Sequence, residues 1–470
     1  MRLESLRDTF DVAIIGAGPA GLAAAAVTAG AGLATLVVDE NAGPGGQIYR
    51  AVTTSPVKRR DILGEDYWAG ERLVADAVRS GAAMLDATTV WSLDRDLAIG
   101  LSRDGSARMI TARRVIIATG AQERPFPIPG WTLPGVMTAG GVQTMLKASG
   151  LVPAGETVIA GTGPLLWLLA SQLVRAGVAI AAILDTTPRA AYLKAAPHAA
   201  GFVLSPLFAK GLALRREVAA KVRVIAGVTE IRAAGFGKLA SVTYAAGGRQ
   251  ETLPVDNLLL HQGVVPNVNL AMAAGCQHRW DARQLCFVPV LDADGLSSVP
   301  GIAIAGDGAG IAGAWAAEER GRLAGVAAVR ALAPQASAPD GQAIRQRLAR
   351  HEAARGFLET LFQPPRQFRV PPSDDTIVCR CEEVTAGTVR EAARLGCEGP
   401  NQLKAFTRCG MGPCQGRLCG LTVTEIIAET RGLSPEVVGS YRLRPPVKPI
   451  SLGELARMPA SAAAVKAVVR

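Results

Sequence analysis

The sequence predicts an α/β protein in which two strand–helix–strand domains are nested and a small cysteine-rich domain follows them. Residues 11–38 and 157–184 each contain a strand, a glycine turn, an apolar helix and a second strand, the pattern of a βαβ unit. A third strand, at residues 302–305, leads through a Gly-Asp turn into an alanine-rich helix. Six of the eight cysteines lie between Cys379 and Cys419. The three glycine turns predict the nested pair, and the cysteine group predicts the further domain.

The composition excludes a disordered chain and does not favour nucleic acid binding. A chain of 470 residues, 49% hydrophobic and 19% charged, allows about three domains with buried cores. The net charge of +10 is spread along the sequence without a run of five basic residues, and only 4% of residues are aromatic. We therefore expect no nucleic acid partner.

Neither of two N-terminal segments has the pattern of a targeting or membrane segment. Residues 1–8 hold four charged side chains and no apolar stretch, so we expect no secretory signal peptide. Residues 12–38 carry no charge, but five glycines and Pro19 divide them into strand, turn, helix and strand, which argues against a membrane span. The expected location is the cytoplasm, with peripheral membrane association as the alternative.

The first glycine turn has the full context of a dinucleotide-binding motif. Gly16 makes the tight turn after the strand, Gly18 lets the backbone approach a pyrophosphate, and Gly21 lets helix and strand pack closely. Pro19 and Ala20 complete the turn as further candidate cofactor-binding residues, and the N-terminus of the helix expected over residues 22–29 offers free N–H groups to phosphates.

An acidic residue at the end of the next strand completes this motif. Asp39 lies 23 residues after Gly16, and it or its neighbour Glu40 is expected to accept hydrogen bonds from an adenosine ribose. A βαβ turn without a ligand is the alternative interpretation.

Three further segments resemble the glutathione-reductase-like flavoproteins, which contain two nested dinucleotide-binding (Rossmann-like) domains. Gly45-Gly46-Gln47 follows the second strand, Ala118-Thr119-Gly120 ends a later strand, and Gly306-Asp307 ends the third. This resemblance implies that the first domain binds FAD, with its flavin side near Gly46 and Gln47 and its ribityl chain at Asp307.

The second glycine turn comprises Gly161 and Gly163, and Asp185 ends the strand that follows. In the resembling family this site binds NAD(P)H. Leu166 replaces the third glycine, and no arginine pair follows to hold a 2′-phosphate, which disfavours NADPH. Bound NADH or another adenine nucleotide such as ATP, and an empty domain that only maintains geometry, both stay open.

The domain boundaries follow from these motifs and from a proline-rich stretch. The predicted parts are an FAD-binding domain (1–121 and 256–332), an inserted second nucleotide-binding domain (122–255), a helical and proline-rich linker (333–375), a cysteine-rich domain (376–440) and a basic tail (441–470).

The absence of cysteines before Cys276 excludes thiol–disulfide exchange beside the flavin. The disulfide reductases of this fold carry a cysteine pair beside the flavin, but this chain has no cysteine before Cys276. Cys276 and Cys286 are isolated, and we expect both to be buried apolar residues. Among the histidines only His261 is a functional candidate, because its segment resembles the family's Gly-x-x-Pro-Asn turn near the flavin.

The cysteine-rich domain is expected to hold a metal centre. Four thiolates from two short loops can bind Zn²⁺ or a [2Fe–2S] cluster. The segment resembles the bacterioferritin-associated-ferredoxin-like domain, although four residues rather than two separate the second cysteine pair. The resemblance favours a [2Fe–2S] cluster, with zinc or an empty site as alternatives. The preferred ligands are Cys379, Cys381, Cys414 and Cys419. Cys409 is the alternative ligand, and Cys397 is expected to be a packing residue.

The whole chain resembles the larger FAD subunit of bacterial heteromeric amine dehydrogenases, which include opine oxidases, proline or hydroxyproline dehydrogenases and hydrogen cyanide synthase. The segments that carry this resemblance are Gly-Gly-Gln-Ile-Tyr-Arg (45–50), Ala-Gly-Asp (305–307) and Gly-Met-Gly-Pro-Cys-Gln-Gly-Arg (410–417). The resemblance implies that a smaller, FAD-containing catalytic subunit oxidises an amine or amino acid. It also implies an FMN at a subunit interface, and electron transfer through the cluster and this chain's FAD to oxygen, a quinone or a carrier.

A small third subunit is a further expected partner, and the basic tail is a candidate partner contact. No catalytic acid or base is assigned in this chain. Two other functions stay open: a stand-alone NADH-dependent flavin and iron–sulfur reductase, and a non-enzymatic assembly subunit that holds zinc.

Overall fold

The first domain is built on a seven-stranded sheet with the order β3-β2-β1-β6-β5-β4, in which β19 also pairs with β6. The computed structural model describes residues 3, 5–353 and 355–458. β1, β2, β3, β6 and β19 pair in parallel, whereas β4, β5 and the first half of β6 form an antiparallel meander. The strands are β1 (Thr9–Ile15), β2 (Thr35–Val38), β3 (Ala83–Leu85), β4 (Thr89–Leu93), β5 (Ala98–Arg103), β6 (Ser106–Ile117) and β19 (Ile302–Ile304).

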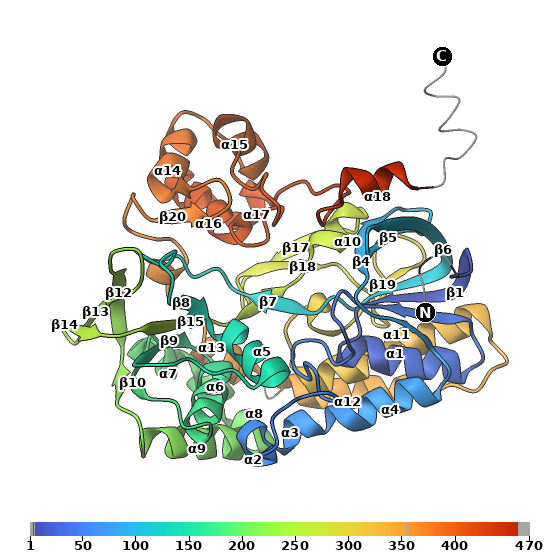
Figure 1. Cartoon of the computed structure of the whole chain (residues 1–470), viewed down its shortest axis with the longest axis horizontal. Coiled ribbons are helices and arrows are strands. Elements are labelled where there is room, and N and C mark those ends of the chain that lie inside the picture. The colour runs from blue at the N-terminus through green and yellow to red at the C-terminus, as the bar shows by residue number, and fades with distance from the viewer. Residues whose placement is uncertain (1–2, 4, 354, 459–470) are drawn as a thin grey trace.

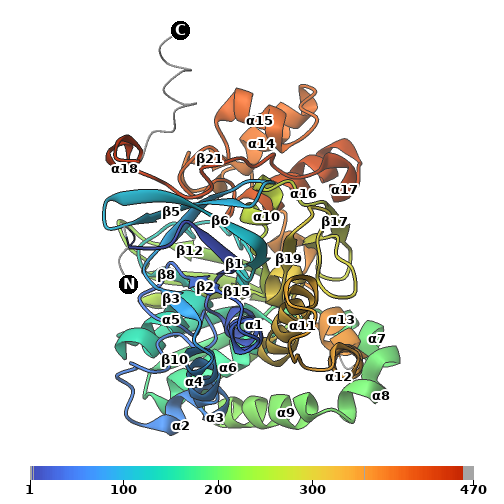
Figure 2. The ribbon, with the colours of Figure 1, turned by 90° about the vertical axis from the view of Figure 1, so that its right-hand side faces the viewer.

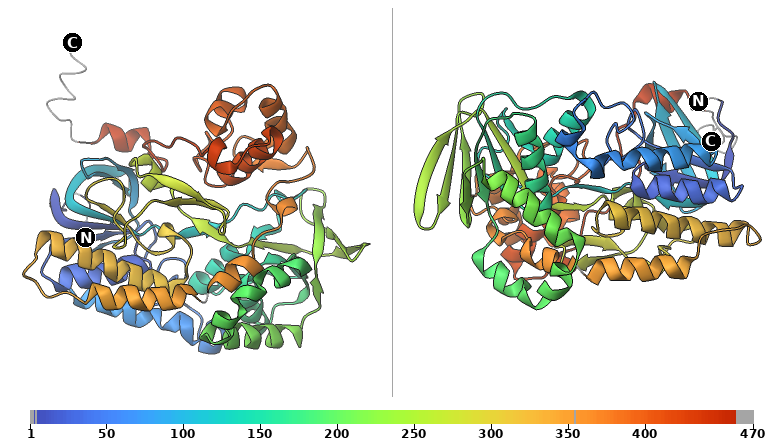
Figure 3. Two further views of the ribbon diagram at one scale, coloured as in Figure 1. Left: turned by 180° about the vertical axis from the view of Figure 1, so that it is seen from behind. Right: turned by 90° about the horizontal axis from the view of Figure 1, so that it is seen from below.

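Three helices cover one face of this sheet and lie side by side when the molecule is seen from below (Figure 3). The helices at residues 19–30 and 314–332 approach closely because their facing residues are small. A Cβ at Gly321 would lie 2.0 Å from the backbone oxygen of Ala20. Ile14 packs toward these helices and Ile15 toward the meander, so both faces of the sheet are buried. The helices are α1 (Pro19–Gly30), α4 (Gly70–Arg79) and α11 (Ala314–Leu332).

The second domain has a five-stranded parallel sheet with the order β11-β10-β9-β15-β8. Its strand β15 lies beyond residue 255, so the sequence-based boundary falls one strand short of this sheet. A separate antiparallel sheet, β12-β13-β14, precedes β15. The strands are β8 (Val136–Thr138), β9 (Thr157–Thr162), β10 (Ile180–Asp185), β11 (Val224–Ala226), β12 (Val228–Ala234), β13 (Ser241–Ala246), β14 (Arg249–Pro254) and β15 (Asn257–Gln262).

The two nested domains are joined by a pair of short antiparallel strands, β7 and β16. The helices of the second domain and the elements around this junction complete the nested part of the chain (Figure 1). They are β7 (Ala121–Glu123), β16 (Val264–Pro266), α2 (Arg60–Leu63), α3 (Glu65–Trp68), α5 (Ala139–Ser149), α6 (Pro164–Arg175), α7 (Arg189–Ala195), η1 (Ala196–His198), α8 (Ala199–Val203), α9 (Pro206–Ala219), α10 (Asn269–Ala273), β17 (His278–Asp281), β18 (Cys286–Pro289) and η2 (Gly306–Ala309).

The linker is helical and packs on the first domain. Ile344 and Leu348 of α12 are buried against α11, beside Leu323 and Val326. The cysteine-rich domain then forms a separate small core that sits above the nested domains in Figure 1. The elements are α12 (Gly341–Ala353), α13 (Arg355–Leu361), η3 (Arg366–Phe368), β20 (Ile377–Cys379), β21 (Val384–Thr385), α14 (Ala386–Arg394), α15 (Pro400–Thr407), α16 (Gly420–Arg431), α17 (Pro435–Val438) and α18 (Leu452–Ala456).

The described part of the tail packs on this chain's own first domain. The amide of Val447 donates to the carbonyl oxygen of Trp91 in β4 (2.9 Å), and Glu454 accepts a hydrogen bond from Ser102 in β5. Figure 2 shows α18 lying over β5. Residues 459–470, the end of the predicted basic tail, lie outside the described residues.

Residues 12–38 fold as most of β1, the glycine turn, α1 and β2, as the sequence predicts. In the described ranges, no helix combines the length and the apolar character that crossing a membrane requires.

Candidate functional site

The first glycine turn brings backbone segments closer than any side chain would allow. Gly16 has a φ of +111°, and a Cβ there would lie 2.4 Å from the carbonyl oxygen of Ala118. A Cβ at Gly21 would lie 1.8 Å from the oxygen of Gly16. α1 starts at Pro19, and its cap residue Gly18 supplies no side-chain hydrogen bond, so backbone N–H groups at this end are free for an anion.

The two acidic candidates have different partners. Asp39 is buried at the end of β2, and its carboxylate accepts hydrogen bonds from the amides of Ala17 (2.6 Å) and Asn41 (2.8 Å). Glu40 is exposed and forms an ion pair with Lys448 of the tail (2.6 Å). Asp39 is thus hydrogen-bonded to the glycine turn, whereas Glu40 is paired with the tail.

The segment predicted to contact the flavin folds onto the glycine turn. The amide of Gly45 donates to the carbonyl oxygen of Ala17 (2.8 Å). Gly46 has a φ of +60°, and a Cβ there would lie 2.7 Å from the Cα of Gly18. The two glycine segments therefore meet backbone to backbone, as a phosphate site with little side-chain bulk requires. Gln47 is exposed at the end of this contact.

A buried lysine for which the sequence gives no functional signal lies directly behind Gln47. Lys147 of α5 is 2% exposed, and its Nζ donates to the carbonyl oxygen of Gln47 (3.1 Å) and to Oε1 of Gln143 (2.9 Å). Burial, and then the nearby charge of Arg50, lower the pKa of Lys147 to about 7. Sequence reasoning missed this residue because it sits in an ordinary helix and only the tertiary fold buries it.

The lowered pKa predicts a specific pH dependence of stability. Between pH 7 and the ordinary lysine value of 10.5, the unfolded chain binds more protons at Lys147 than the folded chain does. Raising the pH through this window therefore favours folding. We expect the unfolding free energy of the wild type, minus that of Lys147→Met, to rise by about 1.4 kcal/mol per pH unit between about pH 8 and 10. Urea unfolding at each pH measures this difference.

The matched control is Lys221→Met, which changes an exposed lysine of the second domain. Its difference from the wild type should not vary with pH in the same window. Parallel profiles for the wild type and Lys147→Met would show that Lys147 is not buried as a neutral amine.

The two remaining flavin-site segments lie at adjacent strand ends. The hydroxyl of Thr119 donates to the carbonyl oxygen of Asn267 (3.2 Å), whose amide donates to the oxygen of Gly120 (2.9 Å). Gly306 packs against α1, since a Cβ there would lie 2.8 Å from the Cβ of Ala20. Because β6 and β19 are parallel neighbours, both segments reach the same edge as the glycine turn.

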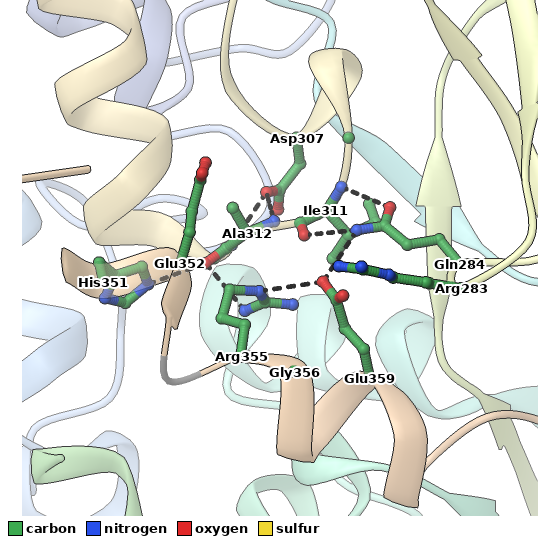
Figure 4. Close-up of polar contacts among 12 residues, drawn as sticks. Arg283, Gln284, Asp307, Ile311, Ala312, His351, Glu352, Arg355, Gly356 and Glu359 are labelled. Atoms are coloured by element: carbon green, nitrogen blue, oxygen red, sulfur yellow. Dashed lines mark hydrogen bonds and ion pairs between the residues drawn. The ribbon is translucent and has the colours of Figure 1, made fainter. Parts of the chain in front are cut away.

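Asp307 organises the loop that precedes α11. Its Oδ1 accepts hydrogen bonds from the amides of Ala312 (2.8 Å) and Gly313 (3.0 Å). Figure 4 shows that side chains from the turn between β17 and β18 and from α12 and α13 hold the same loop. Gln284 exchanges two hydrogen bonds with the backbone of Ile311 (both 2.9 Å).

Two side chains of the linker helices complete this network. His351 of α12 and Arg355 of α13 both donate to the carbonyl oxygen of Ala312 (3.2 and 2.9 Å) (Figure 4). No role for His351, Arg355 or Gln284 can be predicted from the sequence, because nothing in their local sequence connects them with Asp307.

The second glycine turn is also built for close contact. A Cβ at Gly161 would lie 1.6 Å from the carbonyl oxygen of His261 on the neighbouring strand. Leu166, which replaces the third glycine, belongs to α6 and is buried in the core. Asp185 is buried and accepts a hydrogen bond from the amide of Thr187 (2.9 Å). Among the described residues, Gln262 is fully buried and its Oε1 has no hydrogen-bond partner.

His261 belongs to this second site. Its Nδ1 lies 2.9 Å from a carboxylate oxygen of Glu123, whose other oxygen accepts a hydrogen bond from the amide of Gly140 (2.6 Å). A Cβ at Gly163 would lie 3.5 Å from His261 Nε2. The structure therefore places His261 at the second glycine turn.

The isolated cysteines are confirmed as buried: Cys276 is 6% exposed and Cys286 is 1% exposed. Burial raises the pKa of Cys286 to about 12, so this thiol is unreactive.

Three cysteines of the cysteine-rich domain form a group, and two others form a pair. The sulfur atoms of Cys379, Cys409 and Cys419 lie within 4.8 Å of one another and all three residues are buried. Cys381 is exposed and shares a hydrogen bond with Cys414. Hydrogen bonds within the trio lower the pKa of Cys379, which favours the thiolate that binds metals.

This donor set fits a metal centre, because it is composed of soft thiolates supplied by two loops. Of the preferred ligands, the structure brings Cys379 and Cys419 together with the alternative ligand Cys409, whereas Cys381 and Cys414 form a separate pair. Cys397 does not join it: its thiol donates to the carbonyl oxygen of Gly399 (3.4 Å) instead.

Residues 409–419, which we call the cysteine loop, contact the first domain beside the predicted flavin site. Gln122 of β7 donates to the carbonyl oxygen of Arg417 (2.6 Å), and Asn269 of α10 donates to that of Gln415 (3.0 Å). Both acceptors lie between Cys414 and Cys419. Since Gln122 follows Gly120 by two residues, the two candidate redox sites are connected by a short stretch of chain and one hydrogen bond.

Comparison with known proteins agrees with this geometry. Residues 10–331 match the pyridine nucleotide-disulphide oxidoreductase family, and residues 373–458 match the sarcosine oxidase A3 domain. The chain belongs to the pyridine nucleotide-disulphide oxidoreductase family. This membership confirms the predicted fold class of nested dinucleotide-binding domains, and it identifies the chain as a flavin-dependent oxidoreductase.

Relatives in this family cover nearly the whole chain. An opine oxidase subunit of Agrobacterium tumefaciens (strain Ach5) is 50% identical, over 98% of this chain and 94% of its own length. Hydrogen cyanide synthase subunit HcnB of Pseudomonas aeruginosa is 33% identical, over 93% and 96% respectively. The crystal structure of L-proline dehydrogenase from P. horikoshii, at 21% identity, superposes with a TM-score of 0.72 over 96% of this chain and 80% of that one. The predicted resemblance to such subunits is confirmed.

Proposed function

We propose that this chain is the electron-transfer subunit of a heteromeric dehydrogenase or oxidase in which a partner subunit oxidises an amine or amino acid. The substrate class that the relatives favour is an opine, with proline, hydroxyproline or glycine as other candidates. The proposed partners are a smaller FAD-containing catalytic subunit and a small third subunit, with oxygen, a quinone or a carrier as acceptor.

The observation that carries this proposal is the contact between the cysteine loop and β7. The bond from Gln122 to Arg417 attaches the cysteine loop two residues from Gly120 of the predicted flavin site. A bound flavin exchanges two electrons or one and a [2Fe–2S] cluster exchanges one, so together they supply the conversion of a two-electron oxidation into single-electron transfers.

The chain's own residues would hold these groups. The free amides at the start of α1, beside Gly16 and Gly18, would hold the FAD pyrophosphate, and Asp39 at the end of β2 would accept a hydrogen bond from the ribose. Asp307 and the amides of its loop fit the ribityl chain. The four cysteines preferred on sequence grounds would ligate the cluster, namely Cys379, Cys381, Cys414 and Cys419. An FMN would lie at the partner interface.

A second candidate function is supported by the second glycine turn. The unpartnered Oε1 of Gln262 and the free amides at the start of α6 support an adenine nucleotide in this domain, with Asp185 near its ribose. Bound NADH would make the chain a stand-alone reductase, whereas ATP or an empty site would not.

An anaerobic titration distinguishes these functions. The chain is purified alone and together with the subunits that co-purify with it, and the absorbance of flavin and cluster is recorded. NADH, opines, proline isomers and glycine are added separately. We expect no bleaching by NADH, and bleaching by one amine only when the partner is present.

Two results would contradict the proposal. Rapid bleaching of the isolated chain by NADH would identify a reductase. Zinc without iron or labile sulfide in the purified chain would instead favour an assembly subunit.

A further inference from the structure

A tyrosine from the start of the tail lies against the cysteine trio. Tyr441 is 5% exposed, and its hydroxyl donates a hydrogen bond to the sulfur of Cys409 (3.4 Å) and lies 4.0 Å from the sulfur of Cys419. Its sequence context, between a helix and a proline-rich segment, gives no indication of this contact. The hydroxyl faces a ligand sulfur whether or not Cys409 belongs to the ligand set.

The cysteine loop is shaped around this ring. A Cβ at Gly410 would lie 2.4 Å from the Tyr441 ring, and a Cβ at Gly416 would lie 2.5 Å from it. A Cβ at Gly420 would be in ordinary contact, at 3.4 Å. Glycines on both sides of Cys414 therefore leave the space that the ring fills. This is a built position rather than an incidental surface contact.

A positive charge lies over the face of the Tyr441 ring. The Nζ of Lys404 is 4.7 Å from the Tyr441 ring centroid, within the range of a cation–π interaction. A phenol ordinarily has a pKa near 10. The hydroxyl therefore keeps its proton at neutral pH and can act only as a donor toward a thiolate sulfur.

We propose that Tyr441 sets the redox potential of the metal cluster by donating a hydrogen bond to a ligand sulfur. This inference rests on the proposed function, in which the cysteine-rich domain holds a [2Fe–2S] cluster. Reduction adds one electron to the cluster and moves no atom or proton, so the hydrogen bond persists in both states. The bond is stronger to the more negative, reduced form, because hydrogen bonds to charged acceptors are the stronger ones. Tyr441 would therefore favour reduction.

The test is the cluster midpoint potential of the full chain carrying Tyr441→Phe, which keeps the ring and removes the hydroxyl. The wild type and the variant are titrated with dithionite and redox mediators, and the reduced cluster is followed by its electron paramagnetic resonance signal. We expect the ratio of reduced to oxidised cluster at a fixed potential to fall about tenfold. For a one-electron couple this is a shift of about 59 mV to more negative potential.

The matched control is Tyr244→Phe. Tyr244 is also buried, and its hydroxyl donates to Glu251 (2.7 Å) on the neighbouring strand of the separate antiparallel sheet. Its removal should leave the cluster potential unchanged. Iron and labile sulfide are measured in all three proteins, and thermal unfolding shows whether each variant is folded.

Each outcome has a defined meaning. A cluster of full occupancy whose potential is unchanged in Tyr441→Phe overturns the inference and leaves the proposed function intact. A wild-type chain without iron and labile sulfide overturns both. An equal shift in Tyr244→Phe would also overturn the inference, because the effect would then be unspecific.

Discussion

Replacing Gly21 with valine is expected to abolish flavin binding. The Cβ of any side chain at this position would lie 1.8 Å from the backbone oxygen of Gly16, and no rotamer relieves a clash with backbone. α1 must then move away from β1, which displaces the amides that fit the pyrophosphate. The cost is about 3 kcal/mol or more, equivalent to a loss of about 100-fold or more in affinity. The flavin absorbance per polypeptide of the purified variant measures the effect.

Gly30 provides a control within the same helix. A Cβ there meets nothing within 4 Å, and its backbone conformation is accessible to other residues. Gly30→Ala should retain the wild-type flavin content and change stability by no more than about 1 kcal/mol. If Gly21→Val binds flavin as tightly as Gly30→Ala, the first glycine turn is not the flavin pyrophosphate site.

Replacing Cys419 with serine is expected to remove the cluster. Cys419 is 1% exposed, and its sulfur lies within 4.8 Å of the sulfur atoms of Cys379 and Cys409. Serine is a poor ligand for iron because its oxygen is hard and is not ionised at neutral pH. We expect iron and labile sulfide to fall to background, while the flavin of the first domain is retained. Metal analysis and the visible spectrum test both points.

Three other serine variants decide the ligand set. Cys397→Ser should keep the cluster, since the serine hydroxyl can still donate to the carbonyl oxygen of Gly399. Cys409→Ser should also keep it if the four preferred cysteines are the ligands. Loss of the cluster in Cys409→Ser together with its retention in Cys414→Ser would show that Cys409 replaces Cys414.

The local parts of the fold could be predicted well because their signals are local. The turn at Gly16 needs a positive φ and no Cβ, and only glycine satisfies both requirements, so the strand–turn–helix unit is visible in the sequence. Gly161 and Gly163 predict the second domain in the same way. Its last strand, Asn257–Gln262, could not be assigned to it, because strand pairing across 100 residues leaves no mark on either segment.

The contacts made by long-range packing could not be predicted. Lys147 has the sequence surroundings of an ordinary helical lysine, yet the fold buries it behind Gln47. His351 and Arg355 have the sequence context of linker residues, but docking of the linker on α11 brings them to the loop of Asp307. Each of these residues gains its role from a neighbour that is distant in sequence.

The redox character of this protein can be recognised from its sequence alone. Its glycine turns, its Gly-Asp turn and its cysteine spacing are chemical requirements met within a few residues, so they can be recognised without a structure. How these parts are connected is visible only in the folded chain. It docks Arg417 on Gln122 beside the predicted flavin site, groups Cys409 with Cys379 and Cys419, and places the Tyr441 hydroxyl against their sulfur atoms. The physical reason is that packing selects partners by shape and burial in three dimensions, which separation along the chain does not record.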